Sequence, residues 1–249
     1  MSSKREISEP ARRAMLAVLM LVLLAGSVGA AWLVARARHY DPQVAVDILA
    51  DIRAKGLHSF WSDAQVENWY VVYNQAGRRA GWYVDRRRRM PDGTFAGERV
   101  RVYQGRLTEE SWKLSDDARR SKCWVTFYPS VLPLAGIEKR LILSLENGKV
   151  EKTVEVRYRG GPQPKSLGPV PAPKEYVPDG LADLALYQAA VRGKKTVFVA
   201  VPHSDLSLDA INFVEVLVRP LGGRVVVQQY AAATQTTAFD KDRTPVKIT

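Results

Sequence analysis

The stretch "NWYVVYNQAGRRAGWYVDRRRRMPDGTFAGERVRVYQGRL", Asn68 to Leu107, decides the fold class. Runs of aromatic and β-branched residues, which favour strands, alternate in it with glycine-containing turns and with "MPDG". Strands that follow one another through short turns pair in antiparallel fashion. The stretch therefore predicts an antiparallel meander.

The same pattern continues downstream in "CWVTFY", "RLILSLE" and "VEKTVEVRY". The last two segments are joined by Asn147 and Gly148, a pair that strongly favours a tight hairpin turn. Val154, Val156 and Tyr158 alternate with charged residues, which is typical of a sheet with one wet face. We expect a strongly curved antiparallel sheet of about eight to eleven strands.

Two helices are predicted beside this sheet. The first begins after Asp41, which is placed to cap it, has Pro42 at its first position and stops at Gly56. The second covers "LADLALYQAAVR" and ends at Gly193. The predicted class is mainly β (α+β), a curved sheet or half-barrel packed on one or two helices.

A proline-rich segment, 161–180, separates the meander from the second helix. Its prolines lack the N–H group that regular structure uses, so we expect an extended crossing segment inside one domain, 40–249. Beyond the helix, strands are predicted in "TVFVAVPHS", "INFVEVLVRPL" and "RVVVQQY", with a final hairpin around 241–243.

The N-terminal region carries an uncharged run of 22 residues, 14–35, long enough for a helix across a bilayer. Four basic residues precede it and two follow, which favours a cytoplasmic segment 1–13 and an extracytoplasmic, periplasmic domain. Cleavage after Ala30 is the alternative, whereas a lipoprotein is excluded because Ser27 has no thiol. The sequence predicts a single-pass protein of the bacterial inner (cytoplasmic) membrane.

The net charge is +11, and the first 38 residues contribute +4 of it, which leaves about +7 for the domain. A basic domain beside a membrane favours an anionic lipid or glycan as partner, and no nucleic acid is expected. Arg86, Arg87, Arg88 and Arg89 must alternate between two wet faces if they form a strand. With Arg78 and Arg79 they predict a local cationic patch; the alternative is a solvated hairpin that resists edge pairing.

Four aromatic residues are candidates for lining a cavity that takes a lipid or another amphiphile. They are Trp69, Tyr73, Trp82 and Trp124. Aromatic residues at alternating strand positions also build ordinary cores, so this alternative stays open.

No catalytic constellation is evident. Cys123 is the only cysteine, which rules out an intramolecular disulfide, and its strand context predicts a buried structural thiol with no histidine nearby. His203 in "PHSD" has neighbours that diverge in direction, unlike a triad assembled from separate segments. His39 and His58 lack further ligands at metal-site spacing. We predict no enzyme, no cofactor and no metal.

"WYVVYNQAGRRAGWYV" resembles the opening strands of a group of uncharacterised bacterial envelope domains. "YVPDGLADLALYQAA", "KTVFVAVPHSDLSLDAINFVEVLV" and "TTAFDKDRTPVKI" resemble their crossing segment, helix, strand pair and final hairpin, so the resemblance covers about 69–249. It implies the half-barrel of the Lol-type lipoprotein carriers, a sheet wrapped around helices with a lipid-accommodating interior. No catalytic residue follows from it.

The sequence thus predicts a membrane-anchored, extracytoplasmic, non-catalytic domain that binds a lipid or other amphiphile in the cell envelope. The alternative is a structural or assembly scaffold of the envelope that binds a protein or an anionic glycan. An open cavity would favour the first, and a filled interior with an exposed contact surface would favour the second.

Overall fold

The structure, a computed structural model, describes residues 40–61, 65–73, 78–128, 138–158, 161–204, 206–207, 209–230 and 233–248. Contacts divide the chain into two units, Met1–Tyr40 and Asp41–Thr249, and the second is described below. None of the helices within the described residues has both the length and the hydropathy to cross a membrane. The predicted membrane segment 14–35 and the segment 1–13 lie outside the described residues.

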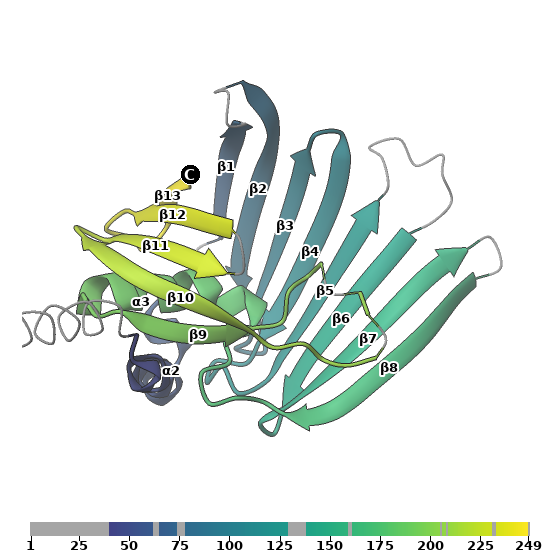
Figure 1. The fold of residues 1–249 in the computed structure, drawn as a ribbon, viewed down its shortest axis with the longest axis horizontal. Coiled ribbons are helices and arrows are strands. Elements are labelled where there is room, and N and C mark those ends of the chain that lie inside the picture. Colours follow the sequence, from purple (N-terminus) through teal and green to yellow (C-terminus); the bar gives the residue numbers. More distant parts are fainter. Residues whose placement is uncertain are drawn as a thin grey trace, which may run out of the picture. The chain divides into compact units, whose positions relative to one another are not determined.

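The first sheet is an eight-stranded meander in which each strand pairs antiparallel with its neighbour in the chain (Figure 1). Its strands are β1 (Val66–Tyr73), β2 (Arg79–Arg89), β3 (Phe95–Tyr103), β4 (Arg106–Leu114), β5 (Ser121–Tyr128), β6 (Glu138–Glu146), β7 (Lys149–Tyr158) and β8 (Gly161–Pro171). Asn147 and Gly148 both adopt positive φ, 52° and 71°, as a two-residue hairpin turn requires. The predicted meander and this predicted hairpin are confirmed.

The second sheet has the order β13-β12-β11-β10-β9, again antiparallel. Its strands are β9 (Thr196–Ala200), β10 (Val214–Gly222), β11 (Val225–Tyr230), β12 (Ala233–Phe239) and β13 (Pro245–Ile248). The final hairpin around 241–243 is confirmed. The described residues thus form thirteen strands in two sheets, where the sequence predicted one sheet of eight to eleven.

The helices begin and end where the sequence predicts. α2 (Pro42–Lys55) is capped by the Asp41 carboxylate, which accepts a hydrogen bond from the Gln43 N–H, and Gly56 ends it. The short 3-10 helices are η1 (Leu57–Ser59) and η3 (Asp179–Leu181), and η3 leads into α3 (Ala182–Arg192). α2 contacts β9, while α3 contacts β10 and β11, so both helices cover the second sheet.

The eight-stranded sheet buries one face. In β6, Leu141, Leu143 and Leu145 alternate with more exposed residues and are at most 5% exposed. Facing partners on β7 include Val154, Val150 and the fully buried Lys152, whose Nζ donates to the Ala210 carbonyl. The segment between β9 and β10 therefore covers this inner face. The outer face is the one opposite.

Trp112 of β4 occupies the centre of the core, where a single buried cluster joins the two sheets and the helices. It lies directly opposite Gly97 of β3 and also contacts Gly180 of η3. A Cβ atom at Gly97 would lie 2.1 Å from the indole, and one at Gly180 would lie 2.5 Å from it. Both positions therefore need glycine for the indole to fit.

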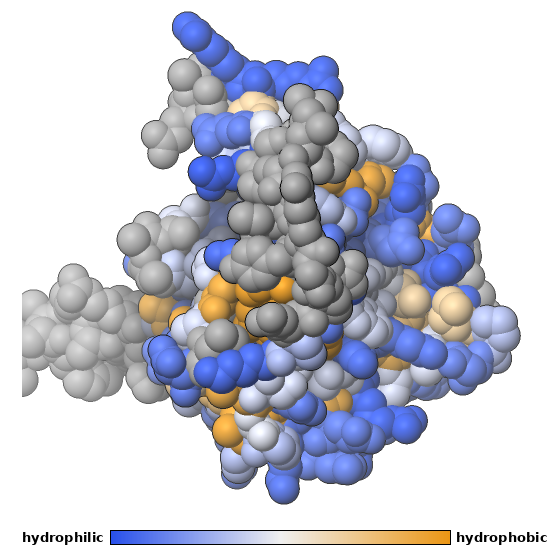
Figure 2. Space-filling view, turned by 90° about the vertical axis from the view of Figure 1, so that its right-hand side faces the viewer, coloured by the Kyte–Doolittle hydropathy of each residue, from blue (hydrophilic) through white to orange (hydrophobic). Residues whose placement is uncertain are grey.

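The proline-rich segment corrects one prediction. Its first half is not an irregular crossing but the edge strand β8, which pairs with β7 on one side only. An edge strand tolerates proline because the outward side needs no hydrogen-bond donor. Figure 2 views the molecule from the side that carries β8, where hydrophilic residues predominate and hydrophobic residues form separate groups.

Candidate functional site

A row of charged residues crosses the inner face of the first sheet. Asp85 on β2, Arg99 on β3 and Glu110 on β4 lie directly opposite one another, so their side chains share one face. The Arg99 guanidinium is 3.2 Å from Asp85 and 3.7 Å from Glu110. It also donates to Asp183 of α3 at 3.1 Å, which joins the sheet to that helix.

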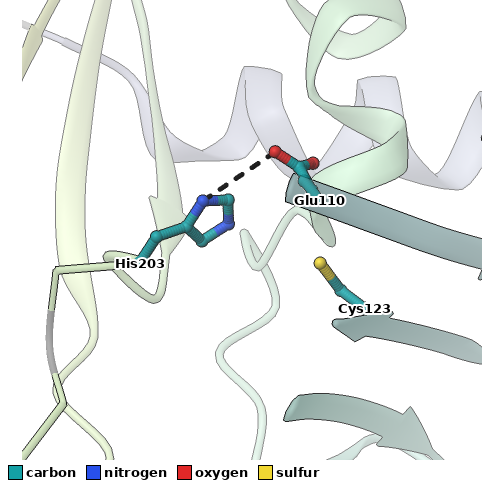
Figure 3. A group of neighbouring side chains, drawn as sticks. All are labelled: Glu110, Cys123 and His203. Atoms are coloured by element: carbon teal, nitrogen blue, oxygen red, sulfur yellow. Dashed lines mark ion pairs between the residues drawn. The ribbon is translucent and has the colours of Figure 1, made fainter. Parts of the chain in front are cut away.

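His203 and Asp179 extend this row. The His203 Nε2 lies 2.7 Å from the Asp179 carboxylate, and its Nδ1 lies 3.9 Å from the Glu110 Oε2. Figure 3 shows His203 facing Glu110, with the Cys123 sulfur directed toward the same space from the neighbouring strand. The ligand atoms of Glu110, Cys123 and His203 all lie within 4.8 Å of one another. We call Glu110, Cys123, Asp179 and His203 the polar cluster.

The polar cluster is mostly buried, but one of its side chains reaches solvent. Cys123 and Glu110 are buried at 4% and 8% exposure, whereas the His203 side chain is 29% exposed. His203 therefore forms the accessible side of the cluster.

Burial and charge act in opposite directions on the imidazole. Burial alone would lower the pKa of His203, but the charge and hydrogen bond of Asp179, together with Glu110, raise it to about 9. Burial would raise the pKa of Asp179, yet His203, the Cys123 thiol and Arg99 hold it below its usual value. The two residues therefore form an ion pair at neutral pH.

The cysteine of the cluster is not set up as a nucleophile. Burial raises the pKa of the Cys123 thiol well above its usual value, with further contributions from Asp179 and Glu110. Its hydrogen bond runs to the Asp179 carboxylate and not to an imidazole base. A reactive cysteine needs the opposite surroundings, a nearby cation and access to solvent.

Two stacked tyrosines flank the charged row. The rings of Tyr70 and Tyr83 lie 4.3 Å apart and nearly parallel, and the Tyr70 hydroxyl donates to the Pro245 carbonyl of β13. Burial raises the pKa of both hydroxyls, so both stay neutral at physiological pH. The two rings thus lie beside Asp85 as uncharged neighbours of the charged row.

Asp85 should make stability depend on pH. Burial, opposed by Arg99, raises its pKa to about 6, above the ordinary value of 3.8. A raised pKa means that its stabilising contribution is present below pH 3.8 and is lost as pH rises through about 6. We expect Asp85→Asn to remove this dependence. The free energy of unfolding is measured with urea for the parent and the variant at pH 4 and pH 7. Between pH 4 and pH 7 the variant should gain up to about 3 kcal/mol of stability relative to the parent. An unchanged difference would contradict the assignment.

Three of the predicted aromatic ligand residues lie on the outer face, where Trp69 and Trp82 line a shallow pocket. Trp69 is 62% exposed, and its ring lies 5.6 Å from that of Trp82. Val71, 49% exposed, pairs with Trp82, and Arg79 borders the same shallow pocket. We call Trp69, Val71, Trp82 and Arg79 the aromatic patch. Trp124 lies on the same face three strands away, so the prediction of one shared cavity is corrected.

The fourth predicted aromatic, Tyr73, is described only in its backbone, as the last residue of β1. Its side chain lies outside the described residues. Trp61 and Trp112, by contrast, are core residues, with ring centroids 6.0 Å apart.

The arginine run Arg86–Arg89 ends β2, and its side chains alternate between faces as predicted. The Arg86 Nε donates to Glu67 on the outer face, whereas the Arg87 guanidinium lies 4.4 Å from the Trp61 ring on the inner face. The inner face is therefore not wet at Arg87, because Trp61 covers it. Arg88 and Arg89 are exposed.

Arg78 and Arg79 are also exposed, but they lie at the other end of β2. At about 3.3 Å per residue, the eight steps from Arg79 to Arg87 span roughly 26 Å. One local patch of six arginines does not form. Binding of an anionic surface by Arg78 and Arg79, or by Arg86–Arg89, stays a prediction.

A basic pocket of about 560 Å³ was missed by the sequence reasoning. Its lining includes Arg53, Arg119, Arg120 and Lys174, with Asp117 as the only acidic residue. These cations come from α2, the β4–β5 turn and the segment after β8, so only Arg119 and Arg120 are neighbours in the sequence.

The polar cluster was missed for a similar reason. Cys123 has no histidine near it in sequence, and the sequence neighbours of His203 diverge in direction, so neither residue by itself indicates a site. The structure brings both together with Glu110 and Asp179, while Asp205 lies outside the described residues. One signal in the sequence was available. Asp85, Arg99 and Glu110 each occupy a strand position whose side chain faces the same side of the sheet as the buried apolar residues.

Comparison with protein-family models, with curated proteins and with solved structures found no match.

Proposed function

We propose that residues 41–249 form a non-catalytic, extracytoplasmic binding domain, held to a membrane by the 14–35 segment, that binds a lipid or other amphiphile. The observation that carries this proposal is the aromatic patch. An exposed group of large apolar side chains is a common mark of a contact site, whereas single exposed apolar residues are ordinary.

The chemistry of the patch fits an amphiphile. Indole rings combine an apolar body with a polar N–H and are favoured where hydrocarbon meets water. The Trp69 Nε1 donates to one Glu67 oxygen while the Arg86 Nε donates to the other, so an arginine is held beside the rings. Apolar groups flanked by Arg79 and Arg86 match acyl chains below an anionic head group.

The mode of binding differs from the one that the resemblance implies. Trp61, Phe95 and Trp112 pack against one another inside the fold, so they fill space that an enclosed ligand would need. We therefore place the amphiphile on the outer face at β1 and β2. The scaffold alternative would use the same exposed patch for a protein partner.

Vesicle binding by the 41–249 unit tests the proposal without the N-terminal segment. We expect the unit to sediment with vesicles of phosphatidylcholine mixed with phosphatidylglycerol, and less with phosphatidylcholine alone. Each indole transferred from water contributes roughly 1.5–3 kcal/mol, so Trp69→Ala and Trp82→Ala should each weaken partitioning about ten- to a hundredfold.

The matched control is Leu221→Ala, which removes a side chain that is 55% exposed on the β10–β11 hairpin, outside the patch. It should bind as the parent does. Equal binding by the parent and both tryptophan variants would refute the amphiphile proposal. Loss of a co-purifying protein in the same variants, with no vesicle binding by the parent, would favour the scaffold.

A further inference from the structure

We propose that Glu110, Cys123 and His203 bind a divalent transition-metal ion of the zinc class, with Asp179 orienting the histidine. This site lies on the inner face and is independent of the aromatic patch.

The spacing of the three donors suits a metal ion. Their ligand atoms already lie within 4.8 Å of one another, and the His203 Nδ1 is 3.9 Å from the Glu110 Oε2. Tetrahedral zinc bonds of 2.0–2.3 Å place ligand atoms roughly 3.3–3.6 Å apart. The His203 nitrogen and the Glu110 oxygen need to approach by about 0.5 Å, and the most separated pair of ligand atoms by at most about 1.5 Å, which side-chain rotations supply.

Asp179 fixes which histidine nitrogen faces the site. Its carboxylate lies 2.7 Å from the His203 Nε2, so that nitrogen keeps its hydrogen and donates it. The Nδ1 is then the ring nitrogen that faces the Glu110 carboxylate (Figure 3). Histidines that ligate metals commonly donate their second N–H to a carboxylate in this way, and Asp179 fills that role.

The donor set selects the kind of ion. Sulfur, imidazole nitrogen and a single carboxylate suit zinc and its chemical neighbours, whereas calcium and magnesium prefer oxygen ligands alone. Three protein ligands leave a fourth position for a small ligand. The 29% exposure of the His203 side chain gives an ion access from that side.

Replacement of protons by the metal ion also balances charge. A metal–sulfur bond replaces the S–H bond of Cys123, and a metal–nitrogen bond replaces the N–H bond at Nδ1 of the protonated His203. Two protons leave as one dication enters, so the buried net charge is unchanged.

Cobalt titration of the full-length, reduced, metal-free chain tests the proposal. We expect one Co²⁺ per chain and a thiolate-to-cobalt charge-transfer band in the near ultraviolet. Because Cys123 is the only cysteine in the chain, this band in the parent locates the ion without any variant. Cys123→Ser should abolish the band, and excess Zn²⁺ should displace cobalt from the parent.

Two further variants distinguish cobalt binding at this site from cobalt binding at other histidine or carboxylate side chains. Asp179→Asn should keep the band while weakening affinity about 10–100-fold, as expected for a residue that acts through His203. His58→Ala is the control, because His58 lies 2.7 Å from Asp116 in a comparable pair that has no cysteine. It should bind cobalt as the parent does. Absence of the band in the parent, or an unchanged band in Cys123→Ser, would overturn the proposal.

Discussion

Replacing Trp112 by alanine is expected to lower the free energy of unfolding of the 41–249 unit by about 3–5 kcal/mol. The indole is only 6% exposed and lies against Gly97 and Gly180, which offer no side chains to fill the space it leaves. Relaxation around the resulting cavity is therefore limited, which sets the cost at the upper end for a core residue. Urea denaturation followed by far-ultraviolet circular dichroism measures it.

Trp124→Ala is the matched control for this experiment. Trp124 sits on the adjacent strand β5, next to Cys123, but points to the outer face, where the Lys122 ammonium lies 5.3 Å from its ring. Its loss should cost no more than about 1 kcal/mol. Equal destabilisation by the two variants would mean that Trp112 is not the centre of the core.

Replacing Arg99 by methionine should be nearly as costly, about 3–5 kcal/mol at neutral pH. The side chain carries the positive charge that faces Asp85, Glu110 and Asp183, and methionine keeps part of the apolar stem but removes this charge and its N–H donors. The remaining carboxylates would then repel one another in partly buried surroundings. Acid should reduce the loss, because Asp85 with a pKa of about 6 becomes neutral first.

Arg101→Met provides the comparison, since Arg101 follows two positions later on the same strand and is exposed beside the Tyr103 ring. Its replacement should change stability by less than about 1 kcal/mol. Thermal melts of both variants at pH 5 and pH 7 check the expectation. A small, pH-independent effect of Arg99→Met would show that the charged row contributes little.

Local signals in the sequence predicted local structure well. Asp41 and Gly56 bound a helix because capping and positive φ are properties of single positions, and Asn147-Gly148 makes its hairpin for the same reason. The mainly β, antiparallel class followed from such turns. The prolines of β8 led to the wrong prediction of an irregular segment. Proline is tolerated in an edge strand but not in a central one, and the sequence does not show which strand lies at an edge.

The candidate site could not be predicted in the same way. Glu110, Cys123, Asp179 and His203 come from β4, β5, η3 and the segment after β9, and they meet only when the second sheet packs on the first. No spacing rule links them. Trp69 and Trp82 were found because they lie on adjacent strands, yet their outward orientation depended on which face the helices and the second sheet cover.

The eight-stranded sheet ends on two unlike edges, β1 and β8. Filaments built strand to strand need two open edges on each molecule, whereas one open edge lets two molecules join and then stops. Pro162, Pro164, Pro169 and Pro171 each remove a donor from β8, which closes that edge to a further strand. Pairing through β1 about a twofold axis would leave a proline edge at each end. The prolines of β8 thus limit strand-mediated self-association of this sheet to a dimer.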